Sequence, residues 1–186
     1  MILRWLGLFA LGAVALSLCD RVHLAYGVLV QAGPKLLGQG LWVLPVFGAG
    51  AAGILAGYPV IRSAFGEPPI AWSPARVLRS GVLAAIAYVV TGPLHASPLL
   101  LSAGLLAAWL LRVGVRRSPA AAVYSLIVGL LGPAAEATFA ALGMHTYSAP
   151  DLLGVPMWLP GIYLHGALFA VDSEALIPTA APAPSR

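Results

Sequence analysis

The chain alternates between long apolar segments and short polar connections along nearly its whole length. Segments of about 20 apolar residues can cross the hydrocarbon core of a bilayer, and in lipid each segment must satisfy its own backbone hydrogen bonds. The pattern therefore predicts an all-α polytopic membrane protein with six transmembrane helices. The apolar segments lie at about residues 1–19, 36–61, 77–94, 99–111, 119–142 and 155–171.

The fourth segment, residues 99–111, is the shortest of the six. At about 1.5 Å per residue it would rise only about 20 Å, whereas the hydrocarbon core is about 30 Å thick. We therefore expect this helix to start earlier than its apolar run, to thin the bilayer, or to re-enter on the side from which it came.

Composition excludes a soluble protein with a single membrane anchor. Hydrophobic residues make up 60% of the 186 residues and charged residues only 9%, with a mean hydropathy of +0.93. Soluble domains contain about 25% charged residues. The basic residues form short clusters between apolar runs, which is typical of membrane-protein loops, so nucleic acid is not an expected partner.

The positive charges predict an orientation, because cytoplasmic loops concentrate Lys and Arg. With both termini cytoplasmic, two basic residues, Arg21 and Lys35, fall outside. Eight fall inside: Arg4, Arg62, Arg76, Arg79, Arg112, Arg116, Arg117 and Arg186. We expect residues 1–171 to form one six-helix membrane domain and residues 172–186 to form a disordered cytoplasmic tail.

Three segments resemble the Insig (insulin-induced gene) family. Residues 41–68, beginning with LWVLP at 41–45, resemble the family's second helix and following loop. Residues 92–97 resemble the end of the third helix, and residues 143–160 resemble the last lumenal loop and the sixth helix. The segments occur in the family's order, and the resemblance extends from about residue 20 to residue 171.

The resemblance implies a non-enzymatic, lipid-binding helical bundle. Insig proteins are six-helix proteins of the endoplasmic reticulum that sense oxysterols and hold back the proteins Scap and HMG-CoA reductase. The family's aspartate at the cytoplasmic end of the fourth helix has no counterpart between Trp109 and Ser118, which argues against Scap-like or reductase-like partners. Nine of the ten basic residues are arginine, and Ala, Gly and Pro are abundant, which favours a bacterial plasma membrane over the endoplasmic reticulum.

The residue types suit a sterol-like or diacylglycerol-like ligand, which needs apolar walls, small residues and very few polar groups. Glu136 stands out because acids within membranes are costly and face a bundle interior or cavity. It either accepts a ligand hydroxyl or lines a wet cavity, or it pairs structurally with a neighbouring helix. His165, in the sixth apolar run, is a candidate partner for it, although a lone histidine there more often makes a packing hydrogen bond. The residues expected to bind the lipid are Gly48, Ala52, Tyr58, Val90, His95, Glu136 and Tyr147.

Other surfaces predict contacts outside the ligand site. We expect Arg112, Arg116 and Arg117 to bind lipid headgroups or a partner at the cytoplasmic face. The small-residue faces, with Gly53 and Gly57 at a spacing that allows helices to approach closely, favour a homo-oligomer.

A small intramembrane enzyme or transporter acting on a lipid is the alternative function. Its basis is that His95, His145, Asp151 and Glu136 all fall toward the predicted outer half of the membrane. The chain lacks an HExxH motif, Cys/His ligand pairs and a nucleophile elbow, which argues against catalysis. We expect no cofactor and no metal.

Overall fold

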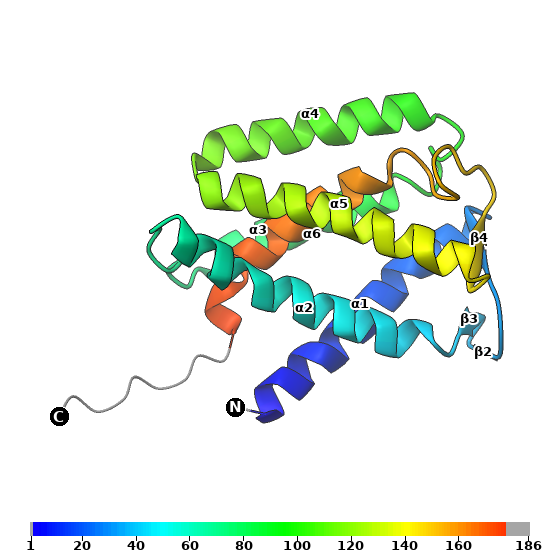
Figure 1. Ribbon diagram of the computed structural model, residues 1–186, viewed down its shortest axis with the longest axis horizontal. Coiled ribbons are helices and arrows are strands. Elements are labelled where there is room, and N and C mark those ends of the chain that lie inside the picture. Colours follow the sequence, from blue (N-terminus) through cyan, green and yellow to red (C-terminus); the bar gives the residue numbers. More distant parts are fainter. Residues whose placement is uncertain (1, 178–186) are drawn as a thin grey trace.

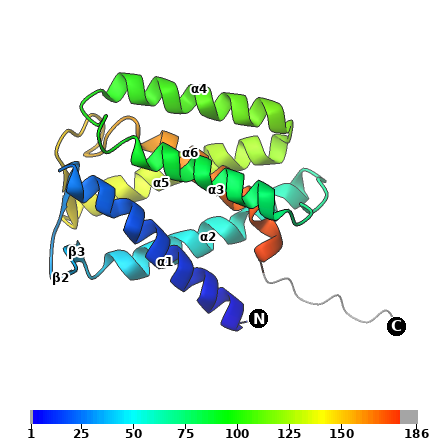
Figure 2. The same ribbon diagram turned by 180° about the vertical axis from the view of Figure 1, so that it is seen from behind.

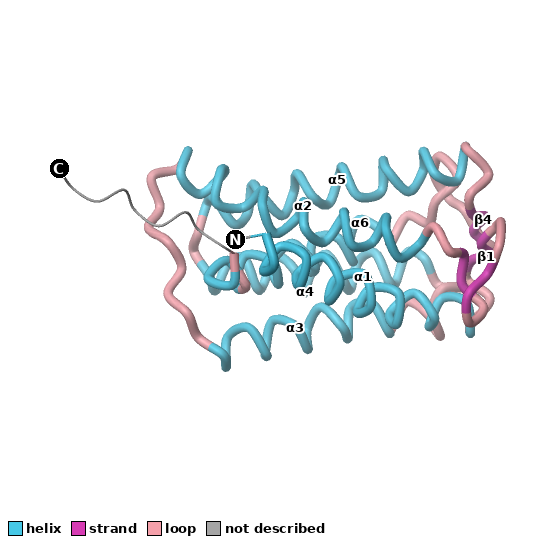
Figure 3. Tube along the Cα trace, turned by 90° about the horizontal axis from the view of Figure 1, so that it is seen from below, coloured by secondary structure: helices cyan, strands magenta, loops and turns pink. Residues whose placement is uncertain are grey.

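The computed structural model of the chain describes residues 2–177, and these form a bundle of helices (Figure 1). Successive helices run in opposite directions, so the start of α1 and the end of α6 lie toward the same end of the bundle (Figure 3). The helices are α1 (Ile2–Ala25), α2 (Val43–Ala64), α3 (Pro74–Val89), α4 (Pro98–Arg116), α5 (Pro119–Ala141), α6 (Leu159–Asp172) and the short 3₁₀ helix η1 (Glu174–Leu176).

Short strands correct the all-α prediction at one end of the bundle. Strand β1 (Leu29–Gln31) pairs antiparallel with β4 (His145–Tyr147), and β2 (Lys35–Leu36) pairs antiparallel with β3 (Gln39–Gly40). Strands of two or three residues are too short to show the alternation that identifies a strand in a sequence. We call this end the strand end. The opposite end, where α4 ends and α5 begins, is the arginine end.

Helix α6 lies at the centre of the bundle. Ten of its fourteen residues are buried, and it packs against α2, α3, α4 and α5. Glycines permit the close approach: Gly129 lies against Leu164, and Gly161 lies against Leu105. Helices α1 and α4 lie at opposite edges in both views (Figures 1 and 2) and expose many leucines, as lipid-facing helices do.

Four helices, α1, α2, α4 and α5, are long and apolar enough to cross a membrane, which indicates a multi-pass membrane protein. Helix α3 has 16 residues and α6 has 14. Fourteen residues rise about 21 Å, less than the hydrocarbon core. The short helices are therefore α3 and α6, not the fourth helix.

Helix α4 is longer than its apolar run because it continues through Arg112 and Arg116. With 19 residues, it begins at Pro98 and ends at Arg116. The Arg112 side chain hydrogen-bonds Ser80 and His165, and the Arg116 side chain pairs with Asp172. Partners within the bundle thus accommodate charges that interrupt the hydropathy pattern.

Residues 172–176, assigned to the tail in our prediction, belong to α6 and η1 or connect them. Asp172 completes α6, and Glu174 of η1 is buried against the bundle, where it pairs with Arg62. Residues 178–186 of the predicted tail lie outside the described residues.

Candidate functional site

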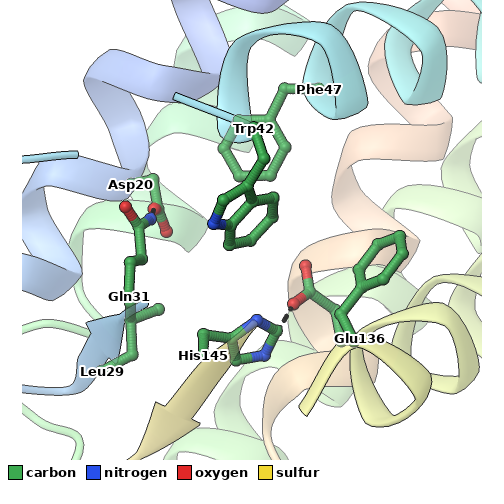
Figure 4. Close-up of a pocket in the computed structure, with 8 residues that line it drawn as sticks. Asp20, Leu29, Gln31, Trp42, Phe47, Glu136 and His145 are labelled. Atoms are coloured by element: carbon green, nitrogen blue, oxygen red, sulfur yellow. Dashed lines mark hydrogen bonds and ion pairs between the residues drawn. The ribbon is translucent and has the colours of Figure 1, made fainter. Parts of the chain in front are cut away.

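Polar side chains from four elements meet inside the strand end. Asp20 comes from the last turns of α1, Gln31 from β1, Glu136 from α5 and His145 from β4. The ladder between β1 and β4 places Gln31 opposite His145, which brings residues more than a hundred positions apart to one site. Figure 4 shows these side chains converging on one cavity. Together with Tyr88, Tyr147 and Tyr163, we call them the strand-end cluster.

Asp20 is held by uncharged donors. Its side chain is buried, and its two carboxylate oxygens accept hydrogen bonds from Gln31 Nε2 at 2.5 Å and from the Tyr88 hydroxyl at 3.1 Å. The His23 ring lies nearby, with Nδ1 3.6 Å from the carboxylate. The amide oxygen of Gln31 in turn accepts from the backbone N–H of Gly40 at 2.7 Å, which ties this acid to the β2–β3 hairpin.

Glu136 is also held mainly by hydroxyl groups. Its Oε1 accepts from the Tyr163 hydroxyl at 2.9 Å, and its Oε2 accepts from the Tyr147 hydroxyl at 3.5 Å. The same Oε2 lies 3.4 Å from His145 Nε2, which is within ion-pair distance. These contacts come from α6 and β4, so Glu136 connects the central helix to the strands.

His165 does not pair with Glu136 but makes the packing hydrogen bond that we favoured for a lone histidine in this helix. Residues two apart on a helix point about 200° away from each other. Tyr163 points to Glu136 on α5, and His165 therefore points toward α4. There, His165 Nδ1 accepts from Arg112 at 2.7 Å, and Nε2 donates to the Leu105 carbonyl at 3.1 Å.

His145 occupies the floor of the cavity, between Trp42 and Tyr147. Its side chain is only 2% exposed, and its ring stacks on the Trp42 ring with centroids 6.1 Å apart. Burial lowers the pKa of His145, although the charge of Asp20 acts in the opposite direction. Within the described chain, His145 Nε2 has no partner with hydrogen-bond geometry, despite its proximity to Glu136.

Tyr147 remains a hydrogen-bond donor at neutral pH. Burial and, secondarily, the charge of Glu136 raise the pKa of the Tyr147 hydroxyl well above its usual range. The hydroxyl therefore keeps its proton and donates it toward Glu136.

The cavity at the centre of the cluster is small, with a volume of about 10 Å³. A volume of about 10–15 Å³ accommodates one water-sized group. Its polar lining consists of Asp20, Gln31, Glu136 and His145, and its apolar lining consists of Leu29, Trp42, Phe47 and Phe139. Two carboxylates next to one such space favour a group that donates hydrogen bonds, such as a hydroxyl.

The structure brings together two of the residues that we expected to bind lipid, Glu136 and Tyr147. Gly48 packs against Phe9 of α1, and an added Cβ would lie 2.7 Å from that ring. Tyr58 is fully buried beside Tyr124, nearer the arginine end. Ala52 is half-buried on α2.

Val90 and His95 lie at and beyond the end of α3 and do not line the cavity of the strand-end cluster. Val90 packs against the core, and His95 Nδ1 lies 2.7 Å from the Gly92 carbonyl oxygen in the turn that follows. Sequence reasoning did not identify Asp20, Gln31, Trp42 and Tyr163 as parts of this site. Only Asp20, an acid at the end of an apolar run, carried a signal, because the other positions depend on strand pairing and helix packing.

The arginine end pairs two of its acids, Asp172 and Glu174, with arginines. Arg116 Nη2 donates to Asp172 at 2.5 Å, and Arg62 Nε donates to Glu174 at 2.6 Å. Arg112 Nη2 donates to Ser80 Oγ at 2.7 Å. Two of the three arginines expected to contact headgroups or a partner, Arg112 and Arg116, thus have partners within the bundle.

Arg117, the third of these arginines, is exposed. It ends α4 in the left-handed conformation, with φ 55°.

Within residues 2–177, no group of three or more His, Cys, Asp and Glu side chains is arranged to hold a metal ion.

Comparisons with known structures show one close architectural match. The crystal structure of the mycobacterial Insig homologue MvINS from Mycobacterium vanbaalenii is 25% identical over 94% of each chain, with a TM-score of 0.80. A cross-linked trimer of an arginine-to-cysteine variant of MvINS is 26% identical over 95% of each chain, with the same TM-score. No protein-family model and no curated protein matches the chain.

Proposed function

Because the chain is an Insig-like protein along nearly its whole length, we propose that it is a non-enzymatic lipid-binding protein of a bacterial plasma membrane. Its ligand is a neutral lipid of sterol-like or diacylglycerol-like chemistry. The lipid hydroxyl reaches the strand-end cluster, and the apolar body remains between helices in the membrane. Occupancy of this site would act as the sensed signal, as the resemblance to Insig implies.

The observation that carries the proposal is the setting of Glu136 and Asp20. Both acids lie in helices of an apolar bundle, and their hydrogen bonds come from hydroxyl and amide donors. Acids within a membrane are costly, and those kept there mark ligand or ion sites by default. A hydroxyl-sized cavity next to both acids supports a ligand that donates one hydrogen bond.

Apolar surfaces beside the cavity suit the body of the lipid. Phe47 of α2 and Phe139 of α5 line the cavity, and Trp42 lies 6.2 Å from Phe139 between ring centroids. Farther along α2, an added Cβ at Gly50 or Gly53 would meet no other atom within 4 Å. A predominantly apolar wall with few polar groups is the usual composition of a lipid or small-molecule site.

We also propose that the protein self-associates. Helices α1 and α4 expose leucine-rich faces, and the relative MvINS has been crystallised as a cross-linked trimer. The alternative of a lipid-acting enzyme or transporter predicts turnover of the bound lipid or its flux across liposomes, and either result would overturn a purely binding role.

Mass spectrometry of the lipids retained after purification in mild detergent tests the proposal. The wild-type protein should retain one neutral lipid, enriched over the bulk membrane and near one molecule per chain. Glu136→Gln should reduce this occupancy about tenfold, because hydrogen bonds to a charged group are worth about 1.5–3 kcal/mol. Asp151→Asn is the matched control, since this acid lies in an exposed loop.

Two results would contradict the proposal. One is a lipid profile in the wild-type protein that equals the bulk membrane, and the other is unchanged occupancy in a folded Glu136→Gln protein. If Glu136→Gln does not fold, Tyr163→Phe provides a second variant, since it removes one donor to Glu136 and leaves the carboxylate in place. It should lower occupancy by a smaller factor.

A further inference from the structure

A second hollow, of about 190 Å³, lies at the strand end and shares no lining residue with the cavity of the strand-end cluster. Helix α1, the β2–β3 hairpin and the start of α2 form its walls, and we call it the hairpin hollow. Its apolar lining is Val14, Leu18, Leu36, Leu37, Val43 and Leu44.

The hairpin hollow is of a size to hold one chain segment of a lipid, and it is open to the surroundings of the bundle. Pockets that enclose a whole small ligand measure about 300–1,000 Å³, and the hairpin hollow is smaller. Val14, Leu18, Leu36 and Leu37 are also exposed at its surface. A lipid bound here would therefore place one chain segment in the hollow and leave the rest in the bilayer.

The hollow also contains a buried hydroxyl without a partner. Ser17 is only 5% exposed, and its Oγ makes no hydrogen bond within residues 2–177. Leaving such a group unsatisfied costs about 1–3 kcal/mol. The backbone carbonyl of Ser17 accepts from Gln39 Nε2 at 2.8 Å, so the serine is fixed between α1 and the hairpin. A ligand atom that accepts a hydrogen bond would satisfy the hydroxyl.

Arg21 adds a positive charge to the same face of α1. It lies four residues after Ser17, the spacing at which helix side chains are neighbours. Arg21 is exposed, and within the described chain its guanidinium makes no ion pair or side-chain hydrogen bond. The lining contains no acid. The adjacent Asp20 bonds to Gln31 and Tyr88, which belong to the strand-end cluster.

We propose that the hairpin hollow binds an anionic phospholipid at the membrane interface. The Arg21 guanidinium pairs with the phosphate, for which its planar set of donors is well suited. Ser17, one helical turn deeper in α1, donates its hydroxyl to an ester carbonyl of the glycerol region. One acyl chain packs against Val14, Leu18 and Leu44.

Native mass spectrometry of the full chain in detergent, titrated with phosphatidylglycerol or phosphatidylcholine, tests the charge requirement. The wild-type protein should prefer phosphatidylglycerol about fivefold, the factor expected for one basic residue near a membrane surface. Arg21→Gln should abolish the preference. Lys35→Gln is the matched control, because Lys35 lies on the same hairpin but does not line the hollow. Equal loss in both variants, or no loss in Arg21→Gln, would overturn the proposal.

Two further arms test the hollow itself. Val14→Trp should fill it and reduce the binding of both phospholipids, and Ser17→Ala should weaken phosphatidylglycerol binding a few-fold. Inorganic phosphate at millimolar concentration should not displace phosphatidylglycerol. Displacement would show an anion site without a lipid requirement and would overturn the proposal, as would unchanged binding to Val14→Trp.

This phospholipid site is independent of the neutral-lipid site. Arg21→Gln should leave the neutral lipid at Glu136 in place, and Glu136→Gln should leave the preference for phosphatidylglycerol unchanged. Either proposal can therefore fail while the other holds. Arg21 has no partner in the described bundle, so its substitution should not change the melting temperature.

Discussion

The two ends of the bundle both bury acids, but only the arginine end pairs buried acids with arginine. At the arginine end, Asp172 and Glu174 pair with Arg116 and Arg62. Glu67, in the loop between α2 and α3, accepts from the Ser118 hydroxyl and from the backbone N–H of Ala120, where α5 starts. At the strand end, Asp20 and Glu136 accept from hydroxyls and an amide, beside a cavity.

The difference separates structural charges from charges available to a ligand. A buried acid paired with arginine is fixed, because removing either partner leaves an uncompensated charge. A carboxylate has about four acceptor positions, and Glu136 uses two of them for tyrosine hydroxyls, so a further hydroxyl can bind beside them. The arginine end therefore holds helices and loops together, whereas the strand end keeps acceptors that a lipid hydroxyl can use.

Arg116→Ala should give the largest loss of stability. It leaves Asp172, whose side chain is 4% exposed, without its cation. Breaking a buried ion pair in this way costs about 3–5 kcal/mol. The thermal melting temperature in detergent measures the loss. Arg117→Ala, which removes an exposed arginine, is the control and should change little. Similar melting of the two variants would remove the contrast between the two ends.

Gly132→Ala should lower the stability of the protein by overpacking the strand end. An added Cβ at Gly132 would overlap the ring of Tyr163, whose hydroxyl donates to Glu136. Overpacking of this kind costs about 1–3 kcal/mol, and the displaced tyrosine should also reduce retention of the neutral lipid. Gly50→Ala is the matched control, because its Cβ would meet nothing within 4 Å. Equal melting temperatures and equal lipid retention in both variants would contradict this prediction.

The number of helices and their alternation could be predicted from the hydropathy pattern, but the lengths of individual helices could not. Helix α4 continues through Arg112 because Ser80 and His165, distant in sequence, accept its hydrogen bonds. Helix α6 is shorter than its apolar run because Val155 pairs with Leu152 before the helix begins at Leu159. Hydropathy is calculated from one segment at a time, so it cannot predict helix ends that depend on contacts with other residues.

The candidate site was predictable only in part, for the same reason. Glu136 could be identified because an acid within an apolar run is unusual whatever surrounds it. Gln31 is an ordinary loop residue in the sequence, and His145 stood out only as a polar residue near the outer side. The pairing of β1 with β4 makes them neighbours. The packing hydrogen bond favoured for His165 is present, but its partners could not be named because the sequence does not specify which side of α6 faces α4.

Acidification should destabilise the strand end through His145. Burial lowers the pKa of His145 in the folded protein below the value of about 6.5 for an exposed histidine. As the pH falls below about 6.5, the unfolded chain binds a proton that the folded chain does not bind, so stability decreases until the pH reaches the folded pKa. The slope from this group is at most about 1.4 kcal/mol per pH unit.

Melting temperatures of the wild type and of His145→Gln isolate this effect. They should be measured from about pH 7.5 to about pH 5, the range in which histidine titrates. Asp20, Glu136 and Tyr147 lie around the His145 ring and are unchanged in the variant. The wild type should lose more stability on acidification than His145→Gln does. Parallel pH profiles would show that the buried imidazole contributes nothing.

Relief of backbone strain should change stability the least, and by the same amount at both ends of the bundle. Arg117 at the end of α4 and Leu153 in the loop before α6 both have positive φ, at 55° and 51°. This conformation destabilises the folded state by about 1–2 kcal/mol for a residue with a side chain. Glycine avoids that cost but loses more conformational entropy on folding, which offsets part of the gain. Arg117→Gly and Leu153→Gly should each raise stability by about 0.5 kcal/mol. If Arg117→Gly instead destabilises the protein, the charge of Arg117 supports the fold. Arginines without an acidic partner would then stabilise the arginine end as well as Arg116, which pairs with Asp172.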